Sequence, residues 1–143
     1  MVLHIIPIMN IVLDTNVLFS AMRSSLGASY RLLQKIDQEP LRLHVSTPLV
    51  LEYEAVLKRN HSLSNVDVEA VVDYLCRISE KHGIFYLWRP ILRDPQDDHI
   101  LELAVKVNAM IVTWNVKDFE PATSKFGLEV VTPRDLLNRL EKS

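Results

Sequence analysis

Four acidic side chains lie close behind apolar segments of the chain: Asp14, Glu52, Asp97 and Asp118. Carboxylates crowded into one site repel each other, and this repulsion raises one or more of their pKa values. A hard divalent cation such as Mg²⁺ relieves the repulsion, because it prefers oxygen ligands. A bound Mg²⁺ or Mn²⁺ ion can polarise a phosphoryl oxygen and lower the pKa of a water molecule. If the fold brings the four acids together, they predict a metal-dependent site acting on phosphate esters.

Each acid also has a plain structural interpretation. Asp14 stands at a turn where aspartate commonly caps a helix. Glu52 could pair with Lys58 or Arg59 on a helix surface, although neither spacing is i,i+4. Asp97 and its neighbour Asp98 would both be stabilised by the dipole of a helix that starts there. We favour the metal site because the acids come from separate segments, and from the residues alone Asp97 and Asp98 both remain candidates for the third ligand.

Apolar runs and amphipathic segments alternate along the chain and predict the elements that position these acids. We expect strands at residues 11–13, 41–45, 84–88, 109–113 and 128–131. The apolar stretch before residue 13 is interpreted as part of the first strand, since it lacks a basic start and a small-residue cleavage site. We expect helices over residues 18–36 with a break at Gly27, and over residues 46–57, 65–81, 100–105 and 133–140.

This alternation predicts an α/β fold with three layers, α/β/α, around a central and mostly parallel sheet. In such open sheets, ligands bind beyond the carboxyl ends of the strands. Asp14, Asp97 and the segment from Asn115 to Asp118 are expected at that edge, and Glu52 is expected to lean over it. The four acids should therefore meet at one place.

The composition fits a single domain over residues 1–143, with a core over about residues 9–140. The net charge of −2 argues against a protein that coats nucleic acid through bulk positive charge, but it leaves a local metal site open. The only cysteine is Cys76, so a disulfide framework within the chain is excluded. With no apolar run long enough to span a membrane, we expect a cytoplasmic protein.

The acidic segments also carry a family resemblance. The run from Ile11 to Leu18, the segment 46–57 with Glu52, the segment 94–104 and the run from Thr113 to Phe119 resemble, in this order, the four motifs of PIN domains. The similarity extends from about residue 9 to residue 140. It is greatest to the bacterial and archaeal group described as toxin components of toxin–antitoxin pairs.

The resemblance implies a Mg²⁺- or Mn²⁺-dependent endoribonuclease. Its catalytic acids would be Asp14, Glu52 and Asp97, and these would hold metal together with Asp118. Asn16, Thr113 and Asn115 would support the site. RNA is the implied substrate and an antitoxin protein the implied partner, and the family permits a homodimer.

The chain departs from the pattern at the fourth motif, because many relatives carry an aspartate where this chain has Asn115. Asp118, three residues later, could supply the missing charge. The departure keeps a second interpretation open, namely a catalytically weakened PIN-like domain that binds RNA or protein. A phosphatase of the haloacid dehalogenase type is disfavoured, because that family needs an aspartate where Asn16 stands.

Overall fold

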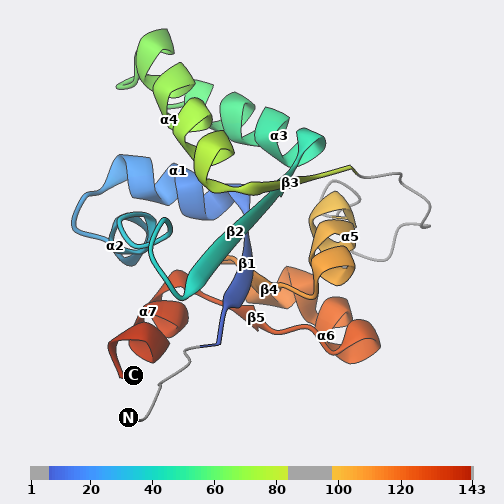
Figure 1. The fold of residues 1–143 in the computed structure, drawn as a ribbon. Coiled ribbons are helices and arrows are strands. Elements are labelled where there is room, and N and C mark those ends of the chain that lie inside the picture. The colour runs from blue at the N-terminus through green and yellow to red at the C-terminus, as the bar shows by residue number, and fades with distance from the viewer. Residues whose placement is uncertain (1–6, 84–97, 143) are drawn as a thin grey trace, which may run out of the picture.

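The computed structural model describes residues 7–83 and 98–142, which fold around a parallel sheet (Figure 1). In these ranges five strands pair in the order β3-β2-β1-β4-β5, and each pairing is parallel. The strands are β1 (Met9–Leu13), β2 (Leu41–Ser46), β3 (Glu80–His82), β4 (Met110–Val112) and β5 (Val130–Val131). The prediction of a three-layer α/β/α fold is confirmed, and the described sheet is wholly parallel.

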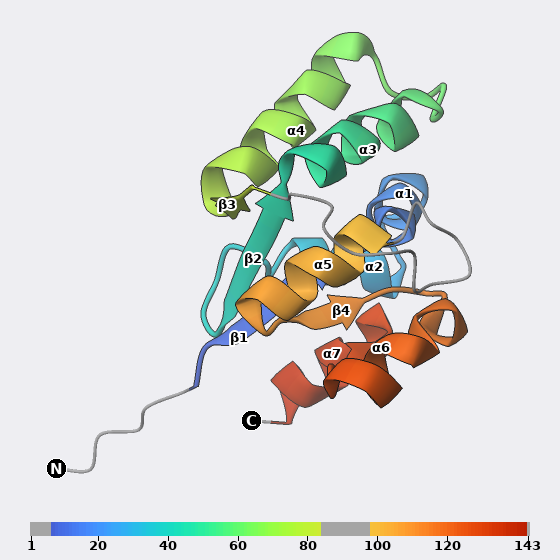
Figure 2. The ribbon, with the colours of Figure 1, turned by 90° about the vertical axis from the view of Figure 1, so that its right-hand side faces the viewer.

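Helices cover both faces of the sheet. They are α1 (Thr15–Arg23), α2 (Ala28–Leu33), α3 (Thr47–Lys58), α4 (Asn65–Ile78), α5 (Asp98–Val107), α6 (Glu120–Phe126) and α7 (Pro133–Glu141), with a 3₁₀ helix, η2 (Val116–Phe119). Figure 1 shows α1, α2 and α7 on one side and α5 on the other. In Figure 2, α5 crosses in front of the sheet, while α3 and α4 extend beyond the carboxyl end of β2.

The central strand β1 ends in a continuous apolar run. Ile11, Val12 and Leu13 are each at most 1% exposed, because the strand is covered on both faces. A strand buried in this way needs a continuous apolar run in place of an alternating one. The run ends at Asp14, where the chain leaves the core and α1 begins.

The strand order reverses direction at β1. The chain moves from β1 outward to β2 and β3, then returns through α5 to β4 on the other side of β1. Loops leaving β1 and β4 therefore diverge to opposite faces, and this reversal point is where parallel α/β sheets bind ligands. Asp14 follows β1 and Thr113 follows β4, so both lie at the reversal point.

The predicted end of helix α4 is wrong. The prediction runs a helix to residue 81, but α4 ends at Ile78 and the next residues form β3. Ser79 has an extended backbone, and its hydroxyl donates to the carbonyl of Leu75, which satisfies one of the last carbonyls of α4. Residues 80–82 pair with β2 although their local sequence pattern is helical. A local pattern contains no information about pairing with a strand that is distant in the sequence.

Other boundaries also differ. The first strand begins at Met9, with residues 7–8 outside it, and residues 1–6 lie outside the described ranges. The predicted strand at 84–88 lies outside the described ranges as well. The predicted break at Gly27 is confirmed, since Gly27 is the N-cap of α2, whereas η2 and α6 were not predicted. None of the helices in the described ranges is both long enough and apolar enough to cross a membrane.

One buried side chain joins α3 to the end of β1. Tyr53 is 1% exposed, and its hydroxyl donates a 2.6 Å hydrogen bond to the carbonyl of Leu13. Burial raises the pKa of this hydroxyl well above 10.0, so it remains a donor at neutral pH. The bond fixes α3, which carries Glu52, against the residue that precedes Asp14.

Replacing this tyrosine tests the bond. Tyr53→Phe should lower the free energy of unfolding by about 1–3 kcal/mol, because it leaves a buried carbonyl without its donor. Urea unfolding at neutral pH measures the change. Tyr30→Phe is the matched control, because the Tyr30 hydroxyl makes no hydrogen bond within the described part of the chain. Equal stability of the two variants would show that the bond contributes nothing.

Candidate active site

Asp14 is a carboxylate held inside the protein at the carboxyl end of β1. It is 6% exposed and caps α1, accepting a 2.7 Å hydrogen bond at Oδ1 from the backbone N–H of Thr15. Its second oxygen accepts a 2.8 Å bond from the hydroxyl of Thr113. The capping role considered from the sequence is therefore real, but it accounts for only one of the two oxygens.

The environment of Asp14 disfavours the charged form of its carboxyl group. Burial is the largest cause that raises the pKa of Asp14 above its ordinary value of 3.8. Hydrogen bonds from Thr113 and Thr15 act in the opposite direction, and the charge of Glu52 adds to the rise. A buried group whose charge is disfavoured in this way is the kind of group that a cation would stabilise.

Thr113 connects the loop after β4 to the loop after β1. It is fully buried, and its hydroxyl donates to Asp14 while accepting from Asn16 Nδ2 at 3.2 Å and from the backbone N–H of Asn115 at 3.0 Å. The carbonyl oxygen of the Asn16 side chain in turn accepts from the backbone N–H of Trp114 at 3.2 Å. These bonds join Asn16 and Thr113 to the Asp14 carboxylate and to the loop after β4.

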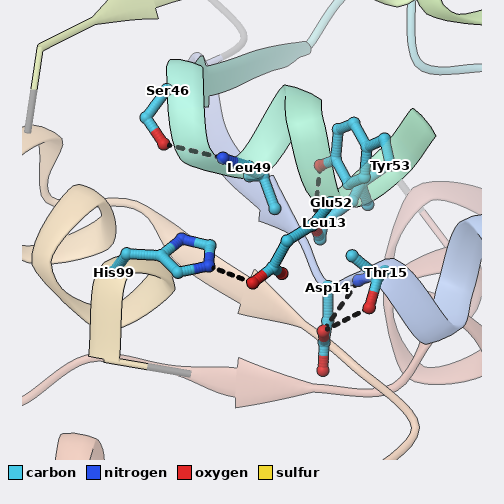
Figure 3. A network of polar contacts seen from close by, with 8 residues as sticks. All are labelled: Leu13, Asp14, Thr15, Ser46, Leu49, Glu52, Tyr53 and His99. Carbon is cyan, nitrogen blue, oxygen red and sulfur yellow. Dashed lines mark hydrogen bonds and ion pairs between the residues drawn. The ribbon is translucent and has the colours of Figure 1, made fainter. Parts of the chain in front are cut away.

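Glu52 reaches the same place from α3. In Figure 3 its carboxylate extends between His99 of α5 and Asp14. Its Oε1 lies 2.7 Å from Nε2 of His99, and its side chain is 33% exposed. Glu52 shares the inward side of α3 with Leu49 and Tyr53, three residues before and one residue after it, which are both buried. The expectation that Glu52 leans over the sheet edge thus agrees with its position.

His99 is a residue that sequence reasoning did not assign to the site. It is 5% exposed, and its Nδ1 is buried without a hydrogen-bond partner among the described residues. A buried N–H without an acceptor is costly, so the proton is best assigned to Nε2, which donates it to Glu52. The pair is 47 positions apart in sequence, and only the neighbouring Asp97 and Asp98 signalled that His99 stands near the site.

The remaining predicted residues have different outcomes. Asn115 is exposed, and it joins the site through its backbone N–H. Asp118 is exposed in η2, and no contact joins it to Asp14 or Glu52 in the described part of the chain. Asp97 lies outside the described residues, directly before α5, and its competitor Asp98 is the half-buried first residue of α5.

The donor set of Asp14 and Glu52 fits a hard divalent cation. Two ionised carboxylates offer about eight lone-pair positions, and the hydrogen bonds described here leave several of them free. Both groups supply oxygen only, which is the ligand that Mg²⁺ and Mn²⁺ prefer. A bound positive charge would offset both the repulsion between the two carboxylates and the cost of burying the Asp14 charge.

Comparison with known proteins identifies the family and the fold. The PIN-domain family model matches residues 10–117, which is most of the chain. No curated protein matches significantly.

Two solved structures have the same fold at low sequence identity. One is VapBC2 from Rickettsia felis, bound to a DNA fragment from its promoter, with 15% identity and a TM-score of 0.61 over 87% of this chain and 98% of that one. The other is FitAB bound to the IR36 DNA fragment, with 16% identity and a TM-score of 0.58 over 86% of this chain and 94% of that one. Because the family model matches residues 10–117, the chain belongs to the PIN-domain family.

Proposed function

We propose that this protein is an endoribonuclease that uses Mg²⁺ or Mn²⁺ to hydrolyse RNA phosphodiester bonds. The observation that carries the proposal is the buried Asp14 carboxylate beside Glu52, at the reversal point of the parallel sheet. Asp14, Glu52 and Asp97 would hold the ion, and Asp118 would have to approach from η2 to join them. When bound, the ion supplies positive charge that stabilises the charge developing on the phosphoryl oxygens.

The chain's own residues orient this ligand set. Thr113 and Thr15 fix the two oxygens of Asp14, so the carboxylate keeps one orientation before any ligand arrives. His99 holds one oxygen of Glu52, and among the described residues no hydrogen bond occupies the other. Such outer contacts typically matter about 10–100-fold for metal affinity or activity. His99 is therefore a positioning residue in this proposal.

Trp114 offers a surface for the substrate. It is 38% exposed, and its Nε1 donates to the hydroxyls of Ser29 at 2.8 Å and Ser20 at 3.0 Å. These bonds hold the indole beside the loop that carries Asn115. An anchored and partly exposed indole is suited to stack on a base of a single strand. In this proposal Trp114 is the residue that stacks on a base of the RNA.

An antitoxin protein is the proposed partner, and a homodimer is compatible with the proposal. The antitoxin rests on the resemblance to toxin components, and VapBC2 and FitAB are two of the solved structures with the same fold. A partner that binds near Trp114 and Asn115 would cover the carboxylates and block access of RNA. Inhibition by the product of an adjacent gene would identify this partner.

A second candidate is a PIN-like domain that binds RNA with little or no cleavage. It is favoured by two observations, the amide at Asn115 and the absence of a described contact between Asp118 and the other acids. Under this candidate the wild-type protein retains RNA in a binding assay with Mn²⁺ but leaves it intact.

Cleavage of labelled single-stranded RNA tests the nuclease directly. The wild-type protein should cut in Mn²⁺ or Mg²⁺ and stop in chelator. Asp14→Asn should reduce the rate by about 100-fold or more, because a group that stabilises developing charge is lost. Asp73→Asn, an exposed acid on α4, is the matched control and should cut normally. Undiminished cutting by Asp14→Asn would show that Asp14 is not in the site.

Replacing the amide tests the second candidate. Asn115 precedes η2 and is exposed, so Asn115→Asp should fold normally. If the amide weakens the metal site, the variant should cut the same RNA at least about tenfold faster than the wild type at equal Mn²⁺. Equal or lower rates in the variant would show that Asn115 does not limit activity.

The raised pKa of Asp14 predicts a pH dependence in metal-free protein. Between the ordinary value of 3.8 and the raised folded value, the folded state binds more protons at Asp14 than the unfolded state does. The contribution of Asp14 to stability therefore falls as pH rises through this window. The free energy of unfolding of wild type minus Asp14→Asn should decrease from pH 4 to pH 7 in chelator. A difference that is flat or rises with pH would contradict the electrostatic account.

A further inference from the structure

A second group of potential metal ligands lies away from Asp14 and Glu52. His44 is on β2, and Glu80 and His82 are on the neighbouring strand β3. The register pairs His44 with Glu80 and Ser46 with His82. Because side chains alternate along a strand, these three residues share one face of the sheet. His44 is buried, His82 is half-buried and Glu80 is exposed, so the group opens to solvent on one side.

The three side chains already present their ligand atoms to one another. His44 Nδ1 lies 2.9 Å from His82 Nε2 and 3.7 Å from Glu80 Oε2, and all three ligand atoms lie within 4.8 Å of one another. Two ligands bound to tetrahedral Zn²⁺ at 2.0–2.1 Å are about 3.3 Å apart. Small side-chain rotations would therefore bring this group to the spacing of a zinc site.

The contacts behind His44 favour coordination through Nδ1. Its Nε2 lies 2.8 Å from Oδ1 of Asn10 on β1, and the amide oxygen accepts the Nε2 proton. Nδ1 is then unprotonated and faces His82 and Glu80. A ligating histidine usually donates its other ring N–H to an oxygen in this way. On the other side, Arg42 Nε lies 3.5 Å from Glu80 Oε1, which leaves Oε2 on the side of His44.

We propose that His44, Glu80 and His82 form a Zn²⁺ site with a fourth position open to water, which fastens the edge strand β3 to β2. Two imidazoles with one carboxylate suit zinc better than Mg²⁺, which prefers oxygen ligands. The site is separate from the proposed nuclease centre. The ligands lie on β2 and β3, and the pairing register places His82 beside Ser46, two strands away from the end of β1 that precedes Asp14, or about 10 Å. The inference does not depend on the proposed nuclease activity.

Zinc binding by the chelator-treated protein tests the site. Titration with ZnCl₂ against a chromophoric chelator should show one site per chain. His82→Gln and Glu80→Gln should each weaken it by more than about tenfold, because each removes a ligand. Glu80 is exposed and His82 is half-buried, so these substitutions leave the buried His44 in place and should not destabilise the fold. His61→Gln, an exposed histidine, is the matched control and should bind Zn²⁺ normally.

Two further readouts separate this site from the carboxylates of the nuclease. Zn²⁺ should raise the melting temperature of the wild type but not of His82→Gln, because the ion joins β2 to β3. Asp14→Asn should retain zinc binding. Absence of saturable binding, or binding unaffected by both ligand changes, would overturn the proposal. Equal loss in Asp14→Asn would place the ion at Asp14 and would also overturn it.

Discussion

The burial of Asp14 is the constraint on which the rest of the site depends. A carboxylate that is 6% exposed cannot rely on water, so the protein must supply its hydrogen bonds. Thr15 and Thr113 do so from two different loops, and Tyr53 holds the strand end just before it. Glu52 then adds negative charge to a group whose own charge is already disfavoured. This arrangement costs stability in a metal-free protein, and a bound cation would offset that cost.

The parallel topology explains how such distant residues meet. Because β1 and β4 are neighbours although nearly 100 residues separate them, their following loops share one edge of the sheet. Thr113 and Asn16 link the two loops, and Trp114 extends the link to Ser20 and Ser29 on α1 and α2. Helix α5 lies on the other side of the sheet from α1, α2 and α7, and it brings His99 to Glu52. Small shifts in any of these elements would therefore change the Asp14 environment.

The fold was predictable because its signals are local. The run Ile11-Val12-Leu13, the Ser46 cap and the Thr132 cap each indicate an element without reference to distant residues. The end of α4 was not, because β3 exists only through pairing with β2. In the site, Asp14 could be placed at the sheet edge because it directly follows an apolar run, and it lies buried at the carboxyl end of β1. The His99–Glu52 pair and the His44 group depend on contacts 36 to 47 positions apart, which no local pattern records.

The central claim is that Asp14 and Glu52 hold one cation together. The most direct measurement is a titration with Mn²⁺ followed by electron paramagnetic resonance, in a His82→Gln background that removes the second proposed site. We expect Asp14→Asn and Glu52→Gln each to weaken Mn²⁺ binding by about tenfold or more, because each removes an oxygen ligand of the same ion. Unchanged Mn²⁺ affinity in either single variant would contradict a shared ion.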